Sequence, residues 1–583
     1  MRIKHFFGLA VLAAMTASCS SNNELVNGGG NGENETGASY ASFSINLPTT
    51  SGTRADGDPT FEDGNTDEYK VNDATLLIFK KGTTEAEGDY TFVESAELGS
   101  MAPWQKPNPD ETGVTTHAKI TAKLESVNKT DNNFALVLLN NGTGTNVKVD
   151  MPSVGEKFSA WNAKPTEKFA KPENGFYMAN APLFKDNNVT TLVPIESTKI
   201  YPTEEEAAKN AATDIYVERG LAKVTLKTGT AATGKTDDKG AYTVANGAYK
   251  DDKVTINNWA LDVTNKKAFP IHNVDGLNED ENYADIWSNT STASPTNNAT
   301  TQRFVDNIAT SAKRVYWGKD PNYDKDNLCT DNSEGKTARE AEFNYVANAD
   351  VATAPDKPLY CLENTFNLAN MKQGQTTRIV FKATYKPASL PEGEKTFYKI
   401  GKNTAIWREA DLVKEIKAAV ASVFSGVTTD KITVNLDAED NKITAAGTHY
   451  IAAVNITVAG VTTITPENIT AINTQLGLNE TKKVGISTYA GGESYYIARI
   501  KHFGDVLTPW SSGGYGSDNL SFLGRYGMLR NNWYELTVSS VSGPGYPSVP
   551  EVKPNTPDDE DDKYISVSVK ILKWAKRTQD VKL

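Results

Sequence analysis

The chain has 583 residues, more than one hydrophobic core usually organises, so its length predicts several domains. Hydrophobic residues make up 38% and charged residues 23% of the chain, and a mean hydropathy of −0.48 excludes a protein that crosses a membrane many times. The net charge of −13 opposes general binding to nucleic acid or to anionic lipid surfaces. Abundant Gly, Pro and aromatic residues favour many short strands and predict an all-β protein.

The N-terminus has the pattern of an export signal. Within residues 1–18, two basic side chains precede an apolar run at 6–14, which has the length of a signal-peptide core and is too short to span a bilayer. Cys19 follows two small residues, an arrangement that resembles the lipobox at which bacterial lipoproteins are cut and acylated. The sequence therefore predicts a lipid anchor on Cys19, with an ordinary signal peptide as the alternative.

A polar tether at residues 20–37 precedes the first predicted strand. Three apolar residues alternate there with polar ones, which predicts a strand with one buried face: Phe43, Ile45 and Leu47. Residues 49–58 then form a polar segment with glycines, which predicts an exposed loop open to proteases. Arg54, in this loop, is the only arginine between Arg2 and Arg219.

Apolar runs bounded by Gly, Asn and Asp predict the strands that follow. They lie at residues 74–79, 134–139, 176–178, 221–226, 254–263, 378–385, 495–500 and 533–541. Three helices are predicted: one at 203–212 with Thr203 as its N-cap, one at 412–424, and one that begins at Pro466 after Thr465 and stops at Gly477. The boundary between two β-domains is predicted near Val217.

The C-terminus combines a linker with a final strand. Residues 543–557 are rich in proline and lead into the acidic run 558–562, so this segment is predicted to be stiff, solvated and unable to join a core. An alternating apolar set follows it: Ile565, Val567, Val569 and Ile571. A strand isolated in this way is predicted to lack a neighbour in its own chain and to need a partner strand from elsewhere.

No pattern in the chain predicts an enzyme, a cofactor or a metal site. The five histidines lack metal-binding or triad spacing. The acidic segment from Asp320 to Asn327 lacks the glycine and glutamate of a calcium-binding EF-hand, and a solvated turn is the favoured interpretation. Cys329 and Cys361 are either joined in a disulfide or present as two buried free thiols, and the sequence leaves both open.

Several segments, in order along nearly the whole chain, resemble the type V fimbrial shaft subunits of Gram-negative Bacteroidota, the fimbrillins, and are most similar to the short, Mfa-type fimbria. They are Cys19 with its lipobox, Leu47–Pro48 to Arg54–Ala55, 258–263, 360–365, 530–545, and the terminal linker and strand. The order of these segments makes the resemblance specific.

The resemblance implies two tandem transthyretin-like β-sandwich domains with a few short helices and a C-terminal donor strand. It also implies an outer-membrane lipoprotein precursor that an arginine-specific protease cuts between Arg54 and Ala55, removing the strand of Phe43, Ile45 and Leu47. The C-terminal strand of another copy would fill the groove. Its implied residues are Ile565, Val567, Val569, Ile571 and Trp574, the last matching a tryptophan of the family.

The predicted function is that of a structural pilin of cell-surface fimbriae, with copies of itself and anchor and tip subunits as partners, acting in adhesion and colonisation. The predicted divisions are a signal peptide at 1–18, a propeptide at 19–54, sandwiches at 55–216 and 217–546, a linker at 547–563 and a donor strand at 564–583. The alternatives are a fimbrial tip or anchor subunit and a surface glycan-binding lipoprotein. In the last of these the aromatic platforms would be Trp104, Trp161, Trp259 and Tyr515.

Overall fold

The structure is a computed structural model, and it divides the chain into two compact units. The N-terminal unit comprises Met1–Ser51 and Asp63–Arg219, and the C-terminal unit comprises Gly52–Glu62 and Gly220–Leu583. Within them the structure describes residues 38–48, 66–99, 114–142, 147–168, 175–185, 188–227, 241–274, 313–315, 317–503, 508, 522–559, 565–572 and 577–578. Most elements are strands in several sheets, with few short helices, so the predicted all-β class is confirmed. The transthyretin-like topology and the domain bounds remain predictions.

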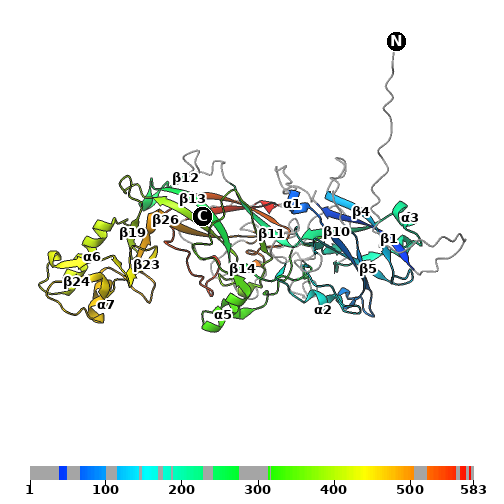
Figure 1. Cartoon of the computed structure of the whole chain (residues 1–583), viewed down its shortest axis with the longest axis horizontal. Coiled ribbons are helices and arrows are strands. Elements are labelled where there is room, and N and C mark those ends of the chain that lie inside the picture. Colours follow the sequence, from blue (N-terminus) through cyan, green and yellow to red (C-terminus); the bar gives the residue numbers. More distant parts are fainter. Residues whose placement is uncertain are drawn as a thin grey trace, which may run out of the picture. The chain divides into compact units, whose positions relative to one another are not determined.

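One large sheet organises the N-terminal unit, in the strand order β3-β2-β5-β6-β10-β1-β4, with β9 also paired to β5. Its strands β1, β4, β5 and β10 are labelled in Figure 1. The strands are β1 (Ser39–Pro48), β2 (Ala74–Lys80), β3 (Thr91–Glu97), β4 (Val114–Leu124), β5 (Asn133–Leu139), β6 (Met178–Asn180), β9 (Val193–Ile195) and β10 (Thr213–Arg219). The apolar run of β2 is buried on both faces up to its last residue, as expected of a strand in the middle of a covered sheet.

Short helices and a hairpin complete this unit. They are α1 (Thr66–Tyr69), α2 (Phe158–Asn162), α3 (Glu204–Lys209) and the hairpin of β7 (Leu183–Lys185) and β8 (Asn188–Thr190). The predicted cap of α3 is present, because the Thr203 side chain accepts a hydrogen bond from the Glu206 amide at 3.3 Å. This cap positions α3 against β1, where the Ser42 hydroxyl donates to the Ala207 carbonyl at 2.7 Å.

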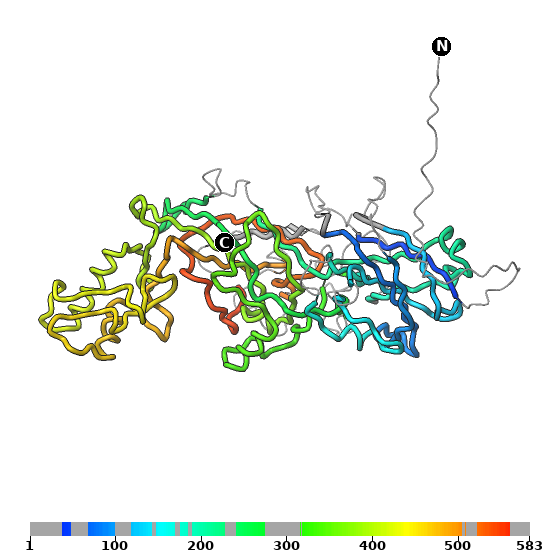
Figure 2. The backbone as a smooth tube through the Cα atoms, in the orientation of Figure 1, coloured from blue at the N-terminus to red at the C-terminus, as the bar shows by residue number. Residues whose placement is uncertain are grey.

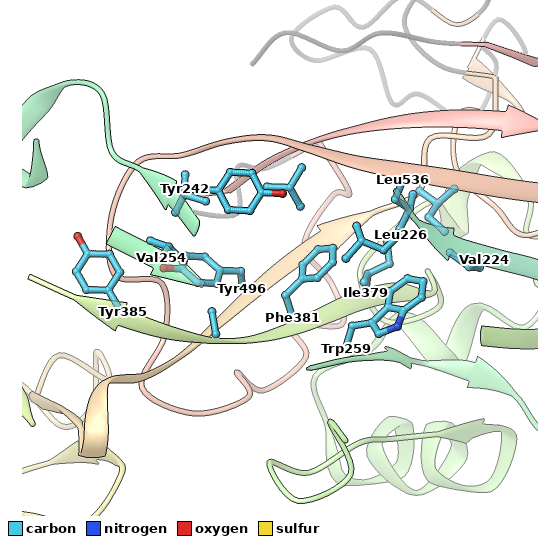
Figure 3. Close-up of a cluster of buried hydrophobic side chains, with 14 of the residues drawn as sticks. Val224, Leu226, Tyr242, Val254, Trp259, Ile379, Phe381, Tyr385, Tyr496 and Leu536 are labelled. Atoms are coloured by element: carbon cyan, nitrogen blue, oxygen red, sulfur yellow. The ribbon is translucent and has the colours of Figure 1, made fainter. Parts of the chain in front are cut away.

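Two sheets of the C-terminal unit share one core. The first has the order β17-β11-β27-β28-β29 and the second β12-β13-β18-β26. Their strands are β11 (Leu221–Leu226), β12 (Ala241–Thr243), β13 (Lys253–Asp262), β17 (Leu359–Leu362), β18 (Arg378–Lys386), β26 (Glu493–Arg499), β27 (Trp533–Val541), β28 (Ile565–Leu572) and β29 (Arg577–Thr578). Val224 and Leu536 from the first sheet pack in one cluster with Trp259, Phe381 and Tyr496 from the second (Figure 3).

The chain between β18 and β26 has a separate core that the sequence did not predict. Two of the three predicted helices lie there, as α6 (Glu409–Val423) and α7 (Pro466–Gln475), the second capped by Thr465. Short strands accompany them, drawn mostly in yellow in Figure 2: β19 (Phe397–Ile400), β20 (Ile432–Val434), β21 (Asp437–Ala438), β22 (Asn441–Lys442), β23 (Gly447–His449), β24 (Ile456–Val458) and β25 (Ile486–Tyr489). Leu412 and Ile416 of α6 pack with Ile472 of α7 in this core.

The remaining described elements of the C-terminal unit are small. They are β14 (Thr264–Asn265), β15 (Lys313–Arg314), α5 (Ser333–Glu342) and β16 (Phe343–Asn344). The Asn332 side chain caps α5 by accepting a hydrogen bond from the Gly335 amide at 2.8 Å.

Replacing Trp259 with Ala is expected to destabilise the C-terminal unit by about 3–5 kcal/mol, the usual cost of deleting a large buried aromatic side chain. The indole is fully buried, lies nearly parallel to the Phe381 ring at a centroid distance of 6.5 Å, and donates a hydrogen bond to the Ala354 carbonyl. Urea denaturation monitored by circular dichroism measures the effect. Val454→Ala, at an exposed side chain, is the control. If Trp259→Ala lowers the free energy of unfolding as little as the control does, the assignment of this core is contradicted.

Candidate functional site: the first and last strands

The first strand, β1, lies between two strands that come much later in the chain. It pairs in parallel with β10, where Phe43 is opposite Thr213, and antiparallel with β4, where Phe43 is opposite Ile120. In the order of the sheet, β10 and β4 are separated by β1 along the described strands. β1 therefore fills a slot one strand wide, which we call the β1 slot.

The predicted apolar residues of β1 are all buried. Phe43 and Ile45 have no exposed surface, and Leu47 is 1% exposed. Burial of three such side chains contributes roughly 1.5–3 kcal/mol each. Without β1, the apolar residues that cover Phe43, Ile45 and Leu47 would be exposed. The facing edges of β10 and β4 would also have unpaired backbone groups.

The opposite face of β1 is also covered, and here the prediction of a single buried face is wrong. Ser42 has no exposed surface, because its hydroxyl contacts the Thr121 hydroxyl at 2.8 Å and donates to the Ala207 carbonyl of α3. A serine can be buried at little cost when its hydroxyl is hydrogen-bonded. The pattern of alternation alone does not contain this information.

Four of the predicted site residues cannot be placed, Trp574 among them. Cys19, Arg54 and Ala55 lie outside the described residues, which resume at Thr66 after Pro48. The lipid anchor and the cleavage site therefore remain predictions.

The last long strand, β28, pairs with a strand of its own chain, so the prediction that it has no neighbour there is wrong. It runs antiparallel to β27, with Val567 opposite Val538 and Val569 opposite Leu536. Ile571 is opposite Tyr534, and Ile565 is opposite Val541. These four partners on β27 all belong to the shared core of the C-terminal unit. Trp574 lies outside the described residues.

The segment before β28 is held on the C-terminal unit and is not the free linker that its composition predicted. Tyr546 forms a pair of 2.8 Å backbone hydrogen bonds with Tyr495 of β26. The Pro550 carbonyl accepts from the Arg378 guanidinium at 2.7 Å, and the Thr556 carbonyl accepts from the Gln373 amide at 2.9 Å. The prolines stiffen a segment that follows the surface of its own unit.

The start of the acidic run is buried in ion pairs. The Asp558 side chain is fully buried, 3.4 Å from Arg499 Nε, and accepts a hydrogen bond from the Thr376 hydroxyl. The Asp559 side chain is 4% exposed and pairs with Arg525 at 2.7 Å. A run of acidic residues is typical of a solvated segment, but each of these two carboxylates has an arginine partner distant in sequence. We call these four residues the Asp–Arg clamp.

The two internal cysteines, Cys329 and Cys361, are free thiols and both are buried, so of the two alternatives the disulfide is not formed. The Cys329 thiol lies 3.8 Å from the Asn370 carbonyl, and Cys361 lies in β17 opposite Ala222. Burial raises the pKa of each thiol to about 12, which keeps both in the unreactive protonated form.

Neither thiol is expected to react with a water-soluble disulfide reagent at pH 8 in the folded protein. A Cys19→Ser precursor removes the remaining thiol from the assay, and titration before and after denaturation measures the outcome. Both thiols should become reactive on denaturation. No free thiol after denaturation would contradict the unpaired state, and rapid reaction of the native protein would contradict the burial.

The acidic turn at Asp320 to Asn327 uses its carboxylates internally. Asp320 is buried and accepts hydrogen bonds from the Asn265 side chain and from the amides of Asn322 and Thr365, and burial raises its pKa to about 7. Asp326 accepts from the Asn370 side chain at 3.1 Å. Among the described residues, no group of three or more His, Cys, Asp or Glu side chains could hold a metal ion.

Two of the four aromatic residues proposed as glycan platforms are not available. Trp161 and Trp259 are 1% and 0% exposed, so both are core residues. Trp104 and Tyr515 lie outside the described residues. In the described part of the chain no helix has the length and apolar character needed to cross a membrane.

Comparison with known proteins gives one family match. Residues 487–580, which include β26, β27 and β28, match the family described as major fimbrial subunit protein type IV, fimbrillin, C-terminal. No curated protein sequence matches the chain.

Solved structures with distant similarity come from Parabacteroides distasonis and Bacteroides eggerthii. A proposed cell adhesion protein from Parabacteroides distasonis ATCC 8503 is 11% identical with a TM-score of 0.37, over 93% of this chain and 99% of that one. A second, from Bacteroides eggerthii DSM 20697, is 12% identical with a TM-score of 0.33, over 92% and 96%. A fimbrial assembly protein from P. distasonis is 10% identical with a TM-score of 0.25, over 40% and 65%.

The described elements are mostly strands, and the family that the C-terminal part of the chain matches is one of fimbrial subunits, which points to a structural role. The match over residues 487–580 supports the predicted resemblance to the fimbrillins in this C-terminal part of the chain. The coarser prediction of a fimbrial subunit at the cell surface is supported in the same way.

Proposed function

We propose that this protein is a structural pilin that polymerises into cell-surface fimbriae by protease-activated donor-strand exchange. Cleavage after Arg54 releases β1, and the C-terminal strand of another copy enters the empty β1 slot. Repetition of this head-to-tail contact does not close on itself and produces a filament. The filament supports adhesion and colonisation.

The position of β1 carries the proposal. The first strand of the described chain fills an inner position of the sheet, between β10 and the edge strand β4, and it precedes the predicted loop that holds Arg54. A single cut there separates β1 from the rest of the unit in the covalent chain. Only non-covalent contacts then hold it in the slot, so a competing strand can replace it.

The C-terminal strand has the spacing that the slot requires. Phe43, Ile45 and Leu47 recur at every second residue, and the apolar residues of β28 recur in the same way from Ile565 to Ile571. Burial of four aliphatic side chains contributes about 6–12 kcal/mol, and ladder hydrogen bonds add to this. To enter another copy, β28 must first leave β27, and the gain in the slot offsets that loss.

The proposed precursor is an outer-membrane lipoprotein anchored through acylated Cys19. The same cut after Arg54 frees the mature subunit from the anchor, so export, release and activation depend on one site. An arginine-specific protease, copies of the same chain, and anchor and tip subunits are the proposed partners.

The test is treatment of the purified precursor with an arginine-specific protease, followed by electron microscopy. Filaments should appear only after cleavage, and the N-terminal sequence of their subunits should begin at Ala55. Cleavage at Arg54 without filaments would contradict the proposal, as would filaments built from uncleaved precursor.

A further inference from the structure

The C-terminal segment is held most firmly at its last described residues before β28. Arg525 Nε and Nη2 both donate to the Asp559 carboxylate, at 2.7–3.1 Å, in a two-pronged contact. The Tyr526 hydroxyl donates to the same carboxylate at 3.0 Å. A charge-assisted contact with three donors fixes the position of Asp559 as well as its charge.

The burial of the clamp makes it costly to open. The Arg525 side chain is 1% exposed and that of Arg499 is 5% exposed, and the side chains of Asp558 and Asp559 are 0% and 4% exposed. Opening the clamp would remove the attraction between oppositely charged side chains that are buried, or would require their full hydration. By contrast, Glu551 of the same segment pairs with Lys483 through side chains that are 80% and 76% exposed, and such surface pairs contribute little to stability.

The clamp also limits the distance from its own unit that β28 can reach. Residues 560–564 separate Asp559 from Ile565, and a chain of that length spans at most about 20 Å when fully extended. If the whole segment from residue 547 were free, the same measure would give about 60 Å. The anchoring of Asp559 therefore restricts the strand to the neighbourhood of one point on its own unit.

We propose that the Asp–Arg clamp is the fixed pivot from which the C-terminal strand leaves its unit, both in the monomer and after exchange. For the monomer, this inference rests on the contacts of the described residues. For the molecule after exchange, it rests on the proposed function. The clamp residues are positioning residues: they give every copy in the filament the same starting point for its donor strand, and so a regular spacing and direction between subunits.

Hydrogen exchange of the full precursor tests the pivot in the monomer. In the wild type, the hydrogen-bonded amides of Val549 and Thr556, within residues 547–559, should be protected. Asp559→Asn removes the charge but keeps the shape, and it should raise exchange in this segment by about tenfold or more. Tyr526→Phe removes one donor and should have a smaller effect. Glu551→Gln is the matched control in the same segment and should leave exchange unchanged.

Peptides from β27 serve as the internal control for folding, and they should exchange equally in all four proteins. Equal protection of 547–559 in wild type and Asp559→Asn, with β27 intact, would overturn the pivot. A uniform loss of protection in β27 as well would show that the clamp holds the whole unit, and would overturn the assignment to the segment alone.

Filaments formed after protease cleavage test the role of the clamp after strand exchange. Asp559→Asn filaments should show a wider spread of bend and subunit spacing than those of the wild type or Glu551→Gln. Filaments as regular as the wild type would overturn the role of the clamp in assembly. If the wild type itself forms no filament, the proposed function fails, and the exchange measured in the monomer still decides whether the clamp anchors the segment.

Discussion

An Arg54→Ala precursor is expected to fold normally and to form no filaments after protease treatment. Arg54 is the only arginine between Arg2 and Arg219, and its loop is polar and contains glycines. Arg219, the next arginine, is 4% exposed, and its guanidinium donates to the Glu68 carbonyl. An arginine-specific protease that acts on the folded precursor is therefore left without the activating site.

The physical reason is the stability of β1 in its slot. While the chain is intact, β1 competes for the slot as a tethered strand at high effective concentration, and an incoming strand from another molecule cannot match this. Loss of filament yield should be nearly complete, whereas the melting temperature should stay within about a degree of wild type because the residue is in a predicted exposed loop.

Two measurements check this prediction. Gel electrophoresis follows cleavage, and electron microscopy counts filaments. Arg54→Lys is the matched control, because it keeps the charge and removes only the arginine that the protease recognises, so it should behave like Arg54→Ala with this enzyme. Trypsin, which also cuts after lysine, should then restore filaments for Arg54→Lys but not for Arg54→Ala. Normal assembly by Arg54→Ala would contradict activation at this site.

Much of the fold was accessible from the sequence because strands and helix caps leave local patterns. The strands β11 and β27 have the bounds that their apolar runs predicted, and α7 begins at Pro466 after its Thr465 cap. The separate core around α6 and α7 could not be predicted from the sequence. Strands such as β21 and β22 have two residues each, which is too short for any periodicity to be visible.

The candidate site was predictable in part, for a related reason. The alternation of Phe43, Ile45 and Leu47 predicted a buried strand, and all three are buried. The pairing of β1 with both β10 and β4, and the cover over Ser42, depend on residues far along the chain. Sequence patterns describe local structure and do not report such contacts.

The C-terminal segment shows the same limit more sharply. Its prolines and acidic residues have the composition of a solvated linker, yet Asp558 and Asp559 are buried against Arg499 and Arg525. Composition records the charge of a segment but not the position of its counter-charges. The prediction that β28 has no neighbour in its own chain was wrong because it assumed that this segment is free.

Replacing Val567 and Val569 together with Asp is expected to abolish filaments while the monomer stays folded. In the proposed filament these residues belong to the apolar set that enters the neighbouring slot. Two carboxylates in an apolar slot cost several kcal/mol, which cancels most of the roughly 6–12 kcal/mol gained from the four aliphatic residues. The pairing of β28 with β27 adds a second consequence, because Val567 and Val569 are opposite the buried residues Val538 and Leu536.

The monomer should nevertheless survive the change. β27 is paired on its other side with β11, and the core residues of both strands remain in place without β28. The melting temperature should fall by a few degrees as β28 detaches from β27, and the far-ultraviolet circular dichroism spectrum should remain close to that of the wild type. Filament yield should fall to background.

Ser566 and Ser568 provide the matched control, since replacing both with Asp adds the same charge to the same strand. They lie opposite Ser540, which is exposed, and Thr537, which is half-buried. The serine variant should therefore keep its melting temperature and most of its filament yield. If both double variants lose filaments equally, the apolar face of β28 is not what enters the slot. If the valine variant unfolds, β28 is instead an essential strand of its own unit, and donor-strand exchange by this segment would be contradicted.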